Sequence, residues 1–84
     1  MTQTVYTNYY EINDLQREIV SIIDTWVHVE KTPIARKEII RQMKKKGTLE
    51  DTTIYSLKIL LKKGFIRRAY TISNKTTYVQ LKRL

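Results

Sequence analysis

Cationic side chains are the residues of this chain best suited to chemistry, and they concentrate in its C-terminal half. Residues 1–30 hold one basic and five acidic side chains, a balance of −4, whereas residues 31–84 hold fifteen basic and three acidic ones, a balance of +12, so the net charge is +8. No acidic residue follows Asp51. Lys and Arg neutralise phosphates, and this polarised charge therefore favours a polyanionic partner over a merely solubilising surface.

The sequence offers no set of residues for catalysis, for a metal ion or for a cofactor. There is no cysteine and only one histidine, His28, so no metal-ligand spacing of the usual kinds is present. Ser21, Ser56 and Ser73 have no credible His/Asp set around them, and no Gly-rich phosphate loop occurs. We expect a binding protein without a cofactor rather than an enzyme.

Length and composition predict one domain, preceded by a tyrosine-rich segment over residues 1–12. A chain of 84 residues buries about 60% of its unfolded surface on folding, which leaves little to spare. The absence of cysteine fits a reducing compartment. No run approaches the roughly 18 apolar residues of a membrane span, and no basic-plus-apolar leader opens the chain. We expect a soluble, cytoplasmic protein.

The stretch from Thr48 to Arg68 must position several of the cations. Its pattern predicts a helix capped by Thr48 and ended by Gly64, because glycine readily adopts the left-handed conformation, followed by a strand from Phe65. The predicted apolar side is Ile54, Leu57, Leu60 and Leu61, and the opposite side holds Thr52, Tyr55, Ile59, Lys62 and Lys63, with Ser56 and Lys58 at its flanks.

Two further helices are predicted upstream. Asn13 caps the first, with Gln16 at the capping-box position, and the helix runs to about Lys31 with an apolar stripe and an acidic outer face. Two patterns compete for the start of the second. In the first, Thr32 is the cap and Pro33 takes the first helical position. In the second, Pro33-Ile34 is a short strand and the helix starts near Ala35. Gly47 ends this helix, and the short turn that follows predicts steeply crossing helices.

A hairpin is predicted after Gly64. Ile66, Tyr70 and Ile72 alternate imperfectly, Ser73-Asn74-Lys75 supplies turn residues, and Tyr78, Val79 and Leu81 form the return strand. Arg67 and Arg68 are predicted at its base and Lys75 at its tip.

The motif Leu57-x-x-Leu60-x-x-x-Gly64-Phe65-Ile66-Arg67-Arg68 resembles the recognition helix and first wing strand of winged helix-turn-helix proteins, and the likeness covers roughly residues 13–82. It implies an α+β winged helix domain over residues 13–84, with three helices followed by a two-stranded wing. It also implies double-stranded DNA as partner. The implied groove-reading residues are Thr52, Thr53, Tyr55 and Ser56, and the implied positioning contacts are Lys58, Lys62, Arg67, Arg68 and Lys75.

Several alternatives stay open from the sequence. Tyr55 could instead pack against the second helix, and Thr53 could be partly buried. Contacts to the DNA backbone from Arg36, Lys37, Lys44, Lys45 and Lys46 are also expected, although a lysine cluster at a helix C-terminus also complements the helix dipole. Tyr6, Tyr9 and Tyr10 could stack on nucleobases or pack against the domain or a second subunit.

Three functional classes are compatible with these patterns. The first is a small transcriptional regulator that binds duplex DNA and forms a homodimer through the N-terminal tyrosines or the first helix. The second is an accessory protein of replication or recombination in a mobile element, with little sequence preference and with single-stranded nucleic acid as an alternative ligand. The third is a winged-helix module that binds an acidic protein surface.

Overall fold

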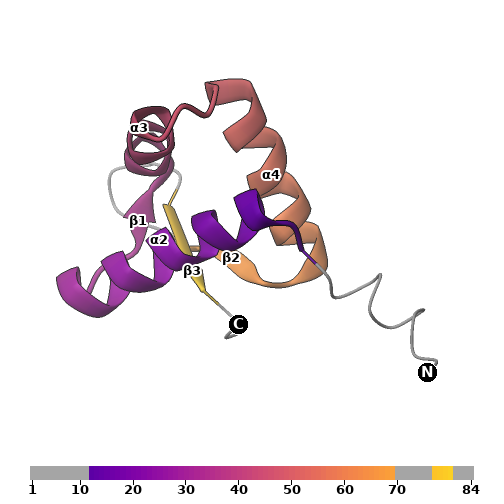
Figure 1. The fold of residues 1–84 in the computed structure, drawn as a ribbon. Helices are drawn as coiled ribbons and strands as arrows, with labels where there is room; N and C mark the ends of the chain where they lie inside the picture. Colours follow the sequence, from indigo (N-terminus) through magenta and orange to yellow (C-terminus); the bar gives the residue numbers. More distant parts are fainter. Residues whose placement is uncertain (1–11, 70–76, 81–84) are drawn as a thin grey trace.

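The computed structural model describes residues 12–69 and 77–80, and these form an α+β fold (Figure 1). In chain order the described elements are helix α2 (Asp14–Glu30), strand β1 (Ile34–Ala35), helix α3 (Arg36–Lys45), helix α4 (Glu50–Lys63), strand β2 (Ile66–Ala69) and strand β3 (Thr77–Gln80). The predicted α+β class and the three helices are confirmed within these residues.

Helix α2 begins as the sequence predicts. The side-chain oxygen of Asn13 accepts a hydrogen bond from the backbone N–H of Gln16 at 2.8 Å, and the Gln16 side chain accepts one from the Asn13 N–H at 3.0 Å. This reciprocal pair satisfies two N–H groups that the first turn leaves without helical partners. The helix ends at Glu30, and the C-cap residue Lys31 is left-handed with φ of 61°. Its inner side, including Ile19, Val20 and Ile23, is buried.

The segment before α3 resolves the two competing sequence patterns. Ile34 and Ala35 form β1, which pairs antiparallel with β3, Ile34 opposite Tyr78 and Ala35 opposite Thr77. Helix α3 then starts at Arg36 after Ala35, which makes no side-chain capping bond. The prediction of Thr32 as the cap of this helix is therefore wrong, because pairing with a strand distant in sequence keeps residues 34 and 35 extended. The alternative prediction, a short strand before the helix, is nearer: the strand and the helix start each lie one residue later than predicted.

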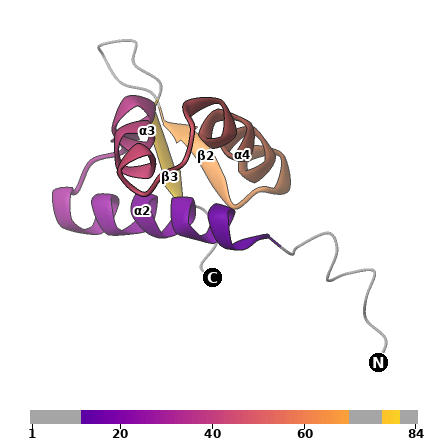
Figure 2. The same ribbon diagram turned by 45° about the horizontal axis from the view of Figure 1, so that its top comes forward.

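The sheet joins distant parts of the chain and holds the helices together. Its strand order is β1-β3-β2, with both pairs antiparallel and Arg68 opposite Tyr78 in the second pair. Figure 2 shows α2 along one side of the molecule, with α3 and α4 lying side by side above it. The buried core between helices and sheet comprises Ile12, Ile19, Val20, Ile22, Ile23, Ile34, Ile39, Met43, Leu57, Leu60, Phe65, Ile66 and Tyr78.

Helix α4 begins one residue later than predicted. Leu49 is its N-cap residue and makes no side-chain capping bond, so the predicted Thr48 cap is wrong. The backbone N–H of Thr48 instead donates to the carbonyl of Met43 at 3.0 Å, closing the turn between the helices. The predicted end is confirmed: Gly64 is left-handed with φ of 81°, and its N–H bonds back to the last turn.

The core-facing side of α4 is rotated from the predicted one. The buried residues are Thr53, Ser56, Leu57 and Leu60, whereas Ile54 and Leu61 are half-buried. At about 100° per residue, the inward direction is turned by roughly 60° from the centre of the predicted apolar side. The Thr53 hydroxyl donates to the carbonyl of Leu49 at 3.2 Å, so this side chain enters the core with its polar group satisfied.

We expect Gly64→Ala to lower the free energy of unfolding by about 1 kcal/mol, because alanine is strained at a φ of 81°. An added Cβ would meet no atom within 4 Å, so the loss is conformational rather than steric. Gly64→Asn should cost less, since asparagine tolerates the left-handed region better. Urea unfolding midpoints measure both changes. Equal midpoints for wild type and Gly64→Ala would contradict the assigned helix end.

Candidate nucleic-acid interface

Helix α4 turns one stripe of side chains outward. Asp51, Tyr55, Lys58 and Lys62 are exposed at positions i, i+4, i+7 and i+11, and Thr52 is exposed beside them. Tyr55 is 65% exposed, so the alternative in which it packs against α3 is excluded. The stripe starts with a carboxylate and ends with two ammonium groups, the arrangement that the helix dipole favours.

A groove lies between the C-terminal half of α4 and strand β2. It has a volume of about 580 Å³, and four cationic side chains line it together with Leu61, Gly64 and Ile66. The cations are Lys58, Lys62, Arg67 and Arg68, all of them exposed. We call this set the α4/β2 basic groove. The fold therefore gathers four of the predicted contact residues on one surface, and no carboxylate lines it among the described residues.

Both arginines of this groove are exposed, and they lie on β2, an edge strand of the sheet. The Arg67 guanidinium donates to the backbone carbonyl of Arg68 at 3.3 Å. Within the described part of the chain, the ion pairs are Arg41 with Glu38 and Lys46 with Glu18, so neither groove arginine is neutralised by a carboxylate of α2. Four like charges close together raise the local positive potential and attract a polyanion.

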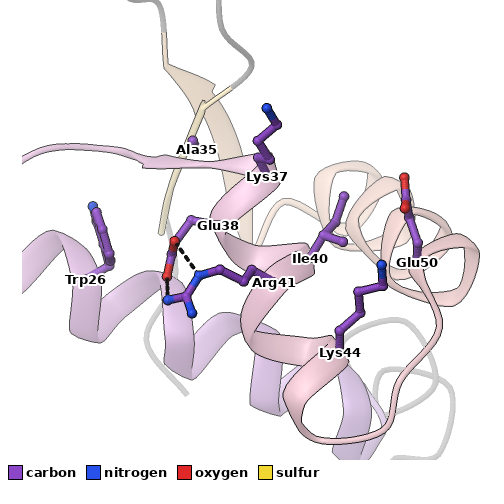
Figure 3. A pocket seen from close by; sticks show the side chains of 8 residues that line it. All are labelled: Trp26, Ala35, Lys37, Glu38, Ile40, Arg41, Lys44 and Glu50. Carbon is purple, nitrogen blue, oxygen red and sulfur yellow. Dashed lines mark hydrogen bonds and ion pairs between the residues drawn. The ribbon is translucent and has the colours of Figure 1, made fainter.

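A second hollow, of about 620 Å³, lies beside α3 and carries mixed charge (Figure 3). Lys37, Arg41 and Lys44 line it from one stripe of α3, and Glu38 and Glu50 line it as well. Arg41 turns back to Glu38, and the hydrogen bonds from Arg41 and Gln42 lower the pKa of the Glu38 carboxyl below its ordinary value. This hollow is a weaker anion site than the α4/β2 basic groove.

Two comparisons with known proteins, against family models and against curated proteins, return no match. No protein-family model matches the sequence, and no curated protein matches it significantly.

Two of the predicted groove-reading residues are inaccessible. Thr53 is 0% exposed and Ser56 is 3% exposed, so neither can reach a base edge, and both predictions are corrected. Both side chains are short, and they lie on the same helical stripe as Leu57 and Leu60. The spacing of three and four residues that joins Thr53 and Ser56 to Leu57 and Leu60 is the signal from which their burial could have been predicted. Thr52 and Tyr55 remain accessible.

The predicted backbone contacts on α3 divide into two groups. Arg36, Lys37, Lys44 and Lys45 are exposed and make no ion pair among the described residues. The ammonium of Lys46 lies 3.2 Å from a Glu18 carboxylate oxygen, which ties the end of α3 to α2. Lys46 therefore connects the end of α3 to α2. This ion pair could not be predicted from the sequence, because Lys46 and Glu18 are far apart in the chain.

Several predictions fall on residues outside the described ranges. They concern residues 1–11 of the tyrosine-rich segment, the hairpin turn Ser73-Asn74-Lys75 with its predicted DNA contact Lys75, and the hairpin-strand residues Tyr70, Ile72 and Leu81. Among residues 12–69 and 77–80, no helix combines the length and apolar character needed to cross a bilayer. The same residues contain no group of three or more His, Asp or Glu side chains arranged to hold a metal ion.

Proposed function

We propose that this protein binds double-stranded DNA as a winged helix-turn-helix domain. In this assignment α4 is the recognition helix, α3 is the preceding helix of the motif, and β2 and β3 are the strands of the wing. The single observation that supports it best is the α4/β2 basic groove, where four cations from two consecutive elements line one surface and no described carboxylate joins them. A duplex phosphate backbone is the polyanion that such a line of charge fits.

We assign phosphate contacts, which position the DNA, and contacts with base edges to different residues of this face. Lys58 and Lys62 extend from the last two turns of α4, while Arg67 and Arg68 extend from the adjoining edge strand, so they would bind phosphates and release counterions. Thr52 and Tyr55, nearer the start of α4, would approach base edges. Because Glu50 and Asp51 repel phosphate, we place the backbone contacts at the C-terminal half of the helix.

The composition of the outward stripe favours modest sequence selectivity. Arginine and asparagine make the strongest bidentate contacts to guanine and adenine, and α4 contains neither. Selectivity would then depend on DNA shape and deformability. This observation keeps two roles within the proposal: a small transcriptional regulator that reads shape, or an accessory protein of replication or recombination that has little sequence preference.

The proposal is tested by binding to duplex and single-stranded DNA, each with random-sequence competitor, across a series of salt concentrations. We expect tighter binding to the duplex and a log–log salt slope of about −3 to −4, which corresponds to the four phosphate contacts of the groove. Tighter binding to single strands would favour the accessory role. Absent or salt-insensitive DNA binding would reject the proposal and favour an acidic protein partner.

Selection of bound fragments from a random duplex pool distinguishes the two roles. A recovered consensus supports the regulator, and its half-site spacing reports the arrangement of any dimer. A pool without consensus supports the accessory protein.

A further inference from the structure

Helix α2 has an outward face that no described residue covers. One side of the helix is buried in the core, and the other holds Asp14, Arg17, Ser21, Thr25 and His28, all exposed, with Asp24 half-buried beside them. We call these six residues the outer stripe of α2. Figure 2 shows the described helices and strands on one side of α2 only.

Two opposite charges on this stripe, Arg17 and Asp24, have no partner among the residues that the structure describes. Arg17 and Asp24 project from the same flank of the helix, seven residues and therefore about 10 Å apart along its axis, too far to pair with each other. Neither joins an ion pair or a side-chain hydrogen bond among the described residues. The neighbouring Glu18, by contrast, is already paired with Lys46.

Two copies of α2 bring these opposite charges together in one relative orientation. When two copies of α2 pack antiparallel about a two-fold axis near Ser21, residue 17 of each copy faces residue 24 of the other, on the same flank. Two Arg–Asp pairs form at once, and Asp14 comes opposite His28. A parallel arrangement would instead place arginine against arginine and aspartate against aspartate.

We infer that the outer stripe of α2 is the seam of a homodimer in which the α2 helices of two copies pack antiparallel through Arg17–Asp24 pairs. The occupant is a second copy because the complementarity is isologous: each charge finds its opposite on the same surface. Ser21 at the axis and Thr25 beside it are small, which permits the 8 to 10 Å helix separation typical of packed pairs.

The proposed seam uses none of the residues of the proposed DNA-binding surface. The outer stripe of α2 and the α4/β2 basic groove lie on different elements and share no residue. A dimer would therefore carry two basic grooves, and the second contact with one DNA molecule would be intramolecular. The dimer itself does not depend on DNA binding.

Charge reversal in the free protein tests the seam by sedimentation equilibrium without DNA. Arg17→Asp places aspartates opposite each other, and Asp24→Arg does the same with arginines. We expect each variant to raise the dimer dissociation constant by roughly tenfold or more, since two attractive pairs become repulsive. The double variant Arg17→Asp/Asp24→Arg exchanges the charges and should restore most of the lost affinity.

Glu30→Arg is the matched control, because it makes the same charge change as Asp24→Arg on the same helix but outside the outer stripe. It should leave dimerisation within about twofold of wild type. A monomeric wild-type protein, single variants that dimerise normally, or a double variant that stays as weak as the singles would each overturn the inference. Circular dichroism melting of each variant confirms that it is folded. Loss of the proposed DNA binding would leave these results unaffected, so the two proposals fail separately.

Discussion

Replacing Lys58, Lys62, Arg67 and Arg68 together by alanine is expected to lower duplex DNA affinity by about two to four orders of magnitude near 0.1 M salt. Each cation that neutralises a phosphate releases a counterion, and the groove supplies four of them. The log–log salt slope should become shallower by about three to four for the same reason. Fluorescence anisotropy of a labelled duplex over a salt series measures both quantities.

The four side chains are exposed, so their removal should leave the fold intact. A variant with Arg36, Lys37, Lys44 and Lys45 replaced by alanine is the matched control, because it also removes four exposed cations but from α3. It should lose less affinity, since only Lys37 and Lys44 of these four line the hollow beside α3, and that hollow also carries carboxylates. Equal losses in the two variants would indicate that net charge rather than the α4/β2 basic groove governs binding. Unaltered affinity in the groove variant would reject the assigned surface.

The groove variant can also be divided between its two elements. Arg67→Ala/Arg68→Ala removes the edge-strand contacts, and Lys58→Ala/Lys62→Ala removes those of α4. We expect each pair to account for about half of the change in salt slope. A double arginine variant with the wild-type slope would show that the proposed wing makes no phosphate contact.

Leu57→Ala should lower the free energy of unfolding by about 2 to 5 kcal/mol. Leu57 is 1% exposed and belongs to the core between α4, α2 and the sheet, so truncation leaves a cavity that the surrounding side chains fill only in part. Small domains have a total stability of about 5 to 15 kcal/mol. Leu57→Ala should therefore unfold at a much lower temperature and urea concentration than wild type.

Leu49→Ala is the control for this change, because it removes the same atoms from a side chain that is 74% exposed. It should alter the free energy of unfolding by less than about 0.5 kcal/mol. Equilibrium urea unfolding followed by circular dichroism compares the two. If Leu49→Ala were as destabilising as Leu57→Ala, the orientation of α4 described above would be wrong.

Features that depend on a few neighbouring residues could be predicted from the sequence. The capping box of Asn13 and Gln16 forms because both partners lie within one helical turn, and α4 ends at Gly64 because glycine adopts the left-handed region at little cost. The inward position of Leu57 and Leu60 followed from their spacing. The concentration of cations after residue 30 is a property of composition alone.

Only the tertiary structure decided the features that join distant residues. Ile34 and Ala35 are a strand because β3 lies beside them, and Lys46 is tied to α2 because Glu18 is near it in space. The inward direction of α4 was decided in the same way. Close packing accepts the short side chains of Thr53 and Ser56 and leaves the larger Ile54 and Leu61 half-exposed, a choice that hydrophobicity along the chain does not contain.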